Sequence, residues 1–125
     1  FTTTAQSKIA ETEVDNSKET TGYSESTYAA TYACENTTDK IFLLSQNEVT
    51  SRGNKNARIV PTDYAKANHA FQSPNAGGYG GYWWLRSPYY SHSYYACYVT
   101  NDGYAFYNLV NRTENGLVPA LSISF

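Results

Sequence analysis

The sequence predicts one α+β domain, with short helices in its first half and antiparallel strands in its second half. Helix-start signals stand at Ser45 and Thr62, and after residue 82 the pattern turns to strands, with a hairpin-turn signal at 101–103 and an alternation of larger with smaller or polar residues over 117–125. The 125 residues suffice for one hydrophobic core and show no internal repeat. We therefore expect residues 1–125 to form a single domain.

The first half of the chain alternates between helix signals and polar stretches. Residues 4–14 are rich in Ala, Gln, Lys and Glu and predict a short helix. Residues 15–38 have no apolar period and predict a long polar loop. The apolar run over residues 40–44 predicts a short buried strand, and Ser45 followed by Glu48 predicts a helix that opens with a capping box.

The middle of the chain contains one further helix signal between two loops. Residues 51–60 form a mostly polar connection. Thr62 as N-cap and Asp63 in the first turn predict a helix over residues 61–67. Residues 72–82 are rich in glycine and contain a proline, so they predict a loop.

The last third of the chain predicts four strands. Residues 95–100 and 104–110 are joined by Asn-Asp-Gly, which is typical of a hairpin turn. Residues 82–86 and 117–125 supply the other two strands, and a proline in the last one indicates an edge position or a strand start.

Three residues of the strand over 82–86 have readable structural roles. Trp83 and Trp84 point to opposite faces of a strand, so one belongs in the core and the other covers a second face. Arg86 lies between apolar residues and Ser-Pro, which predicts partial burial. A buried guanidinium must be paired, and we expect Arg86 to hold neighbouring loops rather than a ligand.

Charge and hydropathy exclude two classes of partner. The net charge is −2, the pI is about 5.6 and no basic run occurs, so we do not expect nucleic acid as a partner. No apolar run approaches the roughly 18 residues of a membrane span. The chain contains no Met, and we expect it to begin inside a longer protein with any targeting signal upstream.

The residues that could carry chemistry are few and scattered. His69 and His92 have no metal-ligand spacing, so no zinc site and no cofactor are expected. Cys97 could be drawn as a nucleophile with either histidine, but it lies within a predicted strand with no motif around it. Cys34 and Cys97 could form a disulfide in an exported protein, which the sequence leaves open.

An ordered series of motifs resembles a known family. TDKIFLLS at 38–45, TDYAKA at 62–67, WWLRSP at 83–88, DG at 102–103 and GLVPAL at 116–121 occur in this order. The series resembles a bacterial domain family with the pattern TDKIFLLS, TDYAKA, WWLRSP, DG and GVRPALW. That family is similar to the C-type-lectin-fold proteins that include formylglycine-generating-enzyme-like domains, and some members look like variable proteins of diversity-generating retroelements.

The resemblance carries expectations and two departures. It implies a C-type-lectin-like fold and a chain that starts inside the domain. Val118 stands where the terminal motif of the family has Arg, and Ser122 stands where it has Trp. Whatever that Arg does in the family, this chain cannot do with the same residue.

The retroelement relationship can be tested on the residues 89–113, which we call the tyrosine-rich segment. Randomised adenines in Asn codons cannot produce Glu, Lys, Gln, Met or Trp. The segment contains none of these five, whereas the other 100 positions contain 17 of them. At that rate about four would be expected in the segment, so their absence favours diversification.

Tyrosine in such a segment suits ligand contact. Its side chain supplies a large, stiff and amphipathic surface, while Ser and Asn add adaptable hydrogen bonds. The alternative to ligand contact is that these tyrosines only cover an ordinary face of a sheet. The expected contact set consists of Tyr89, Tyr90, Ser91, His92, Ser93, Tyr94, Tyr95, Tyr98, Thr100, Tyr104, Phe106 and Tyr107.

These expectations favour a non-catalytic domain that binds an unknown protein or glycan, outside the cell, at a cell surface or on a phage particle. Two alternatives stay open: an enzyme domain of the formylglycine-generating or cell-wall-modifying type, and a passive structural domain of a surface or fibre protein. Calcium-dependent sugar binding of the usual lectin kind is disfavoured, because no Glu-Pro-Asn or Gln-Pro-Asp triplet occurs.

Overall fold

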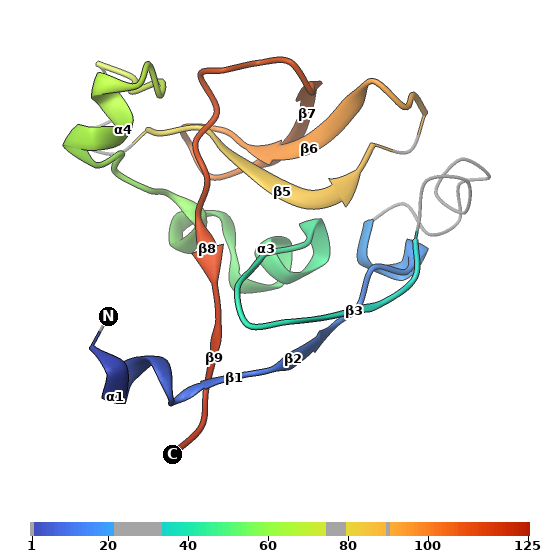
Figure 1. Ribbon diagram of the computed structural model, residues 1–125. Coiled ribbons are helices and arrows are strands. Elements are labelled where there is room, and N and C mark those ends of the chain that lie inside the picture. The colour runs from blue at the N-terminus through green and yellow to red at the C-terminus, as the bar shows by residue number, and fades with distance from the viewer. Residues whose placement is uncertain (1, 22–33, 75–79, 90) are drawn as a thin grey trace.

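A computed structural model describes residues 2–21, 34–74, 80–89 and 91–125 (Figure 1). The first half holds α1 (Thr3–Gln6), β1 (Ile9–Ala10), β2 (Thr12–Val14), the 3₁₀ helix η1 (Lys18–Thr21), β3 (Thr37–Asp39), β4 (Phe42–Leu43), α3 (Gln46–Arg52), the 3₁₀ helix η2 (Asn54–Ala57) and α4 (Asp63–Ala67). The second half holds β5 (Trp83–Pro88), β6 (Tyr95–Val99), β7 (Ala105–Leu109), β8 (Pro119–Ala120) and β9 (Ser122–Ile123). Short helices and antiparallel strands confirm the α+β class.

The largest sheet is the antiparallel β5-β6-β7 sheet, and α3 lies against one of its faces (Figure 1). The register of β5 on β6 shifts between Trp84 and Pro88, so this strand carries an irregularity next to the tyrosine-rich segment. The turn between β6 and β7 covers residues 101–103, as the Asn-Asp-Gly signal predicts.

Among the residues that the structure describes, three two-stranded antiparallel sheets join distant parts of the chain. β1 pairs with β9, β2 with β3, and β4 with β8. The N-terminal and C-terminal segments consequently meet at β1 and β9 (Figure 1). Ser124 N–H also donates to the Lys8 carbonyl at 2.9 Å, which extends the β1–β9 pair beyond its strands.

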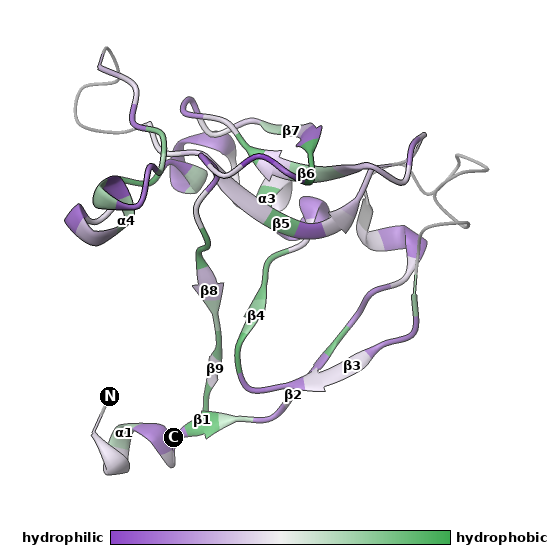
Figure 2. Ribbon diagram, turned by 45° about the horizontal axis from the view of Figure 1, so that its top comes forward, coloured by the Kyte–Doolittle hydropathy of each residue, from purple (hydrophilic) through white to green (hydrophobic). Residues whose placement is uncertain are grey.

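The hydrophobic core lies between the β5-β6-β7 sheet and the α3–η2 region. Its buried members are Val49, Ala57, Trp83, Leu85, Cys97 and Val99. The Trp83 indole N–H donates to the Ala57 carbonyl at 3.0 Å, which satisfies the only polar atom of that side chain. Burial alternates along β5, so the prediction that Trp83 and Trp84 face opposite ways is confirmed. Hydrophobic colouring covers β4, which follows the polar β2–β3 pair (Figure 2).

Several local predictions are confirmed. Ser45 opens α3 with a complete capping box, in which Glu48 is the reciprocal partner. The Thr62 hydroxyl accepts from Ala65 N–H at 3.1 Å and caps α4. Both caps depend on atoms three residues apart, which is why the sequence shows them directly.

Two element predictions are wrong. The helix expected over residues 4–14 ends at Gln6, and β1 and β2 follow it. Pairing with β9 and β3 overrides the helix propensity of that stretch. The strand expected over residues 117–125 divides into β8 and β9, because its two halves pair with different partners.

The long polar loop expected over residues 15–38 is only partly correct. Its described portions include η1 and β3, and residues 22–33 lie outside the described part of the chain.

Candidate ligand-binding surface

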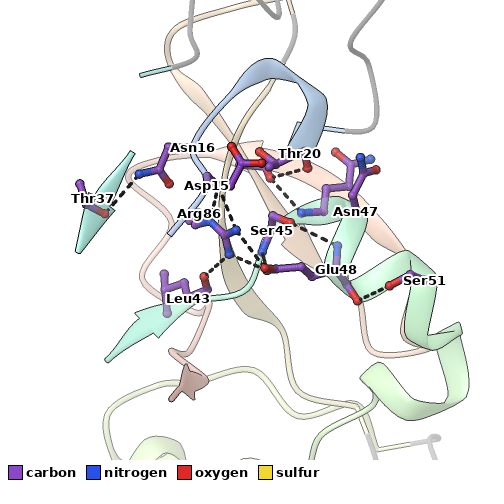
Figure 3. Close-up of polar contacts among 12 residues, drawn as sticks. Asp15, Asn16, Thr20, Thr37, Leu43, Ser45, Asn47, Glu48, Ser51 and Arg86 are labelled. Atoms are coloured by element: carbon purple, nitrogen blue, oxygen red, sulfur yellow. Dashed lines mark hydrogen bonds and ion pairs between the residues drawn. The ribbon is translucent and has the colours of Figure 1, made fainter. Parts of the chain in front are cut away.

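The framework beneath the tyrosine-rich segment centres on Arg86 (Figure 3). Its guanidinium donates to both carboxylate oxygens of Glu48, with Nη1 at 2.5 Å and Nη2 at 3.0 Å. Nη1 also donates to the Leu43 carbonyl at 2.8 Å, and Nη2 donates to the Asp15 carbonyl at 3.0 Å. The predicted role of Arg86 as a clamp on neighbouring loops is confirmed by these contacts with three separate segments.

The Glu48 carboxylate takes part both in the ion pair with Arg86 and in the capping box of α3. Burial by itself would raise the pKa of Glu48, but hydrogen bonds from Arg86 and from the Ser45 backbone N–H outweigh it and lower that pKa. The carboxylate therefore stays ionised and joins α3 to β5.

The structure sorts the expected contact set by exposure, apart from Tyr90, which lies outside the described residues. The exposed members are His92, Ser93, Tyr94, Tyr104 and Phe106. The half-buried members are Ser91, Tyr95, Thr100 and Tyr107. The buried members are Tyr89 and Tyr98. The last two side chains pack beneath the surface, which corrects the expectation that they form part of its exposed contact area.

Tyr98 is the centre of an aromatic layer on the sheet face away from Cys97. Its ring makes edge contacts with Tyr82 at 5.4 Å, Trp84 at 6.2 Å and Phe106 at 6.5 Å between centroids. Phe71 extends the layer by stacking on Tyr82 at 4.2 Å. Rings at these separations and angles add favourable contacts beyond their buried area. Phe106, the exposed ring of the layer, is thus supported from below.

A second aromatic group stands at the base of the hairpin. Tyr89 stacks on Tyr107 at 3.9 Å, and Tyr95 meets both rings edge-on at 5.6 Å and 5.3 Å. The exposed Tyr94 ring lies 4.8 Å from the Tyr95 ring, and Phe106 stacks on Tyr107 at 4.6 Å, which joins the two groups. The exposed Tyr94 and Phe106 rings are therefore in contact with less exposed rings of the same segment.

The hairpin tip is anchored to the η2 region. Arg58 Nε donates to the Asp102 carbonyl at 3.1 Å, and Gly103 N–H donates to the Thr100 carbonyl at 2.9 Å. Tyr104 N–H donates to the Thr100 hydroxyl at 3.1 Å, so the turn is closed on both sides. The surface is a hairpin fixed at its base and at its tip.

A family model described as "Domain of unknown function (DUF6273)" matches residues 1–125. The chain belongs to this family. A search of the curated proteins and a search of the solved structures each found no match. In this DUF6273 domain, no helix among the described residues is long and apolar enough to cross a membrane.

The sequence motifs of the DUF6273 domain fall on the framework. WWLRSP forms β5, which supplies Trp83 and Leu85 to the core and Arg86 to the clamp. The DG pair stands at the hairpin tip, and the terminal motif contains β8. These positions supply core packing and the hydrogen bonds of the Arg86 clamp.

Two exposed apolar residues at this surface were missed by the sequence reasoning. Val110 and Leu117 line a shallow hollow of about 280 Å³ together with Trp84 and Ala96. The signal for Val110 was available, because it continues the alternation of Tyr104 and Phe106 one position beyond the strand. No such pattern marks Leu117, because its position depends on how the segment that contains it packs alongside β5.

The two thiols of the DUF6273 domain differ in environment, and both are free. Burial raises the pKa of the Cys97 thiol to about 12, and its Sγ donates to Gln46 Oε1 at 3.2 Å. Cys34 is exposed. The hydrogen-bonded, buried thiol is therefore a poor nucleophile.

Proposed function

We propose that this domain is a non-catalytic ligand-binding module of C-type-lectin-like fold, which presents the tyrosine-rich segment to a protein or a glycan. One observation carries the proposal: Tyr94, Tyr104 and Phe106 are each more than half exposed on one hairpin, at 51%, 55% and 54%. Exposed aromatic side chains gathered in one place are typical of interaction sites. Tyrosine suits this role because it offers a large contact area with few torsions to order.

The origin of this surface is part of the proposal. Its residues are diversified by a retroelement, and the protein acts at a cell surface, outside the cell or on a phage particle. The absence of Glu, Lys, Gln, Met and Trp from residues 89–113 supports this origin. A reverse-transcriptase gene beside the coding gene, with a near-copy template repeat matching these codons, is the expected genomic finding.

The enzyme alternative finds little support in the thiols. Chemistry of the formylglycine-generating type needs a reactive thiol pair, and Cys34 and Cys97 are the two cysteines of the chain. Cys97 is buried, and its raised pKa, about 12, leaves almost no thiolate at neutral pH. The structural-domain alternative predicts no ligand at all, so a binding measurement separates it from the proposal.

The test compares the parent domain with two matched variants on a glycan array and against a displayed peptide library. The first variant carries Tyr94→Ser, Tyr104→Ser and Phe106→Ser. The control carries Tyr64→Ser, an 81% exposed tyrosine in α4 outside the segment. We expect parent and control to select the same ligands and the triple variant to lose them. Equal binding by all three proteins would overturn the proposal, as would failure of the parent to bind either kind of ligand.

A further inference from the structure

Randomised Asn codons could produce the residue found at every position of the tyrosine-rich segment, but the structure places these positions in two different environments. Any residue in it is compatible with randomised Asn codons, including Cys97, Val99 and Gly103. The structure separates positions that hold the fold from positions that only face outward. The difference appears along β6, around the hairpin tip and along β7.

Framework positions of the segment point toward α3 and the core. Cys97 and Val99 are 2% and 0% exposed and belong to the core cluster, and Ala105 packs against that cluster. Val99 and Ala105 are cross-strand partners, so their side chains share this face. A larger or charged residue at any of the three would overpack the core or bury an unpaired polar group.

Gly103 is a framework position for a different reason. Its φ of +91° lies in the left-handed region, where a side chain is strained. A Cβ at this position would also lie 2.0 Å from the carbonyl oxygen of Asn54. That oxygen belongs to the backbone of η2, to which Arg58 also ties the tip through the Asp102 carbonyl. The hairpin can approach η2 this closely only without a side chain at 103.

Outward positions form a matching set on the opposite face of the hairpin. Tyr94, Tyr104, Phe106 and Val110 are 51%, 55%, 54% and 58% exposed. Val110 N–H donates to the Tyr94 carbonyl at 3.1 Å, and Thr100 N–H donates to the Tyr104 carbonyl at 2.8 Å, so these pairs continue the ladder of Phe106 with Tyr98. Residues directly opposite one another in such a ladder share a face.

We propose that Tyr94, Tyr104, Phe106 and Val110 determine the ligand specificity of this domain, and that Cys97, Val99, Gly103 and Ala105 are fixed positioning residues within the same segment. The inference rests on the proposed binding function and divides its surface residue by residue. Outward side chains can change without loss of core contacts, and a few exposed anchors suffice to change a binding preference. The framework residues hold the hairpin at one distance from η2 and α3.

The experiment uses two libraries of the whole chain displayed on yeast. The outward library randomises positions 94, 104, 106 and 110, and the framework library randomises positions 97, 99, 103 and 105 with the same codons. The folded fraction is measured as protease-resistant display. We expect it to be at least about tenfold higher in the outward library, because framework changes exceed the small stability margin of a domain.

Both libraries are then selected against two unrelated probes, hen-egg lysozyme and serum albumin. We expect distinct binders for each probe from the outward library, with binding lost when the four positions are returned to the parent residues. Equal folded fractions in the two libraries would overturn the assignment of positions. A folding contrast without binders for either probe would overturn the specificity role of the four positions, whereas the proposed binding function fails only if the parent domain binds nothing on the glycan array and in the peptide library.

Discussion

Arg86 and Glu48 form a bidentate ion pair that joins the edge strand β5 to the first turn of α3. The Nη1–Oε2 and Nη2–Oε1 separations are 2.5 Å and 3.0 Å. The side chain of Arg86 is 12% exposed and that of Glu48 is 39% exposed. The pair therefore lies at the boundary between core and solvent, where a charge without its partner is costly. It holds the N-terminal segment, β4 and α3 in place behind the hairpin.

Replacing Arg86 should destabilise the fold. Arg86→Ala leaves the Glu48 carboxylate and the Leu43 and Asp15 carbonyls without their donor, and we expect a loss of about 3 kcal/mol in the free energy of unfolding. Chemical denaturation measures it. Lys66→Ala removes an exposed ion pair with Asp63 and is the control, with an expected change below about 0.5 kcal/mol. Equal losses in both variants would contradict the clamp.

Stability should fall in acid through Glu48. Its pKa is lowered in the folded state, so its contribution is complete above the unfolded pKa of about 4.3 and is lost as the pH falls through the folded value. Denaturation between pH 7 and pH 3 should show a shallower decline in Glu48→Gln than in the parent, with lower stability at pH 7. Glu11→Gln, at an exposed position, should retain the parental decline. An unchanged decline in Glu48→Gln would exclude this linkage.

Two glycine substitutions separate backbone strain from steric clash. Gly53→Ala and Gly103→Ala both place a side chain at positive φ, +80° and +91°. Gly53 has nothing within 4 Å of its Cβ position, so its substitution should cost about 1 kcal/mol. Gly103→Ala adds the contact with the Asn54 carbonyl and should cost at least about 2 kcal/mol more. Similar melting curves for the two variants would show that the tip moves away from η2 freely.

Core and surface aromatics should respond differently to truncation. Trp83 is buried and donates to the Ala57 carbonyl, so Trp83→Ala should cost about 3–5 kcal/mol. Tyr104→Ser removes a ring that is more than half exposed and should change stability by less than about 1 kcal/mol. Thermal unfolding of both variants measures the contrast. A loss for Tyr104→Ser as large as that for Trp83→Ala would make the tyrosines ordinary core residues.

The two cysteines should differ in reactivity toward a thiol reagent. In the native protein we expect rapid modification of Cys34 alone, because Cys97 is buried and its raised pKa, about 12, suppresses the thiolate. Unfolding in denaturant should release the second thiol. Rapid modification of both thiols in the native state would contradict the buried position of Cys97. Rapid modification of neither thiol would indicate that the two cysteines form a disulfide.

Local chemistry determined the parts of this protein that the sequence alone predicted. The caps at Ser45 and Thr62, the hairpin turn over residues 101–103 and the alternation of Trp83 with Trp84 each depend on atoms a few residues apart. The composition of the tyrosine-rich segment is likewise a property of the chain itself. These features could be predicted because no distant partner is needed to specify them.

Only the tertiary structure decided the features that depend on distant partners. The stretch after Gln6 becomes strand because β9 lies more than a hundred residues away in sequence yet pairs with it, and the end of the chain divides because β4 and β1 take different halves. Propensity cannot report such pairing, since its free energy comes from contacts that exist only after the chain has closed. The same reason separates Gly103, fixed by the Asn54 carbonyl, from its exposed neighbour Tyr104.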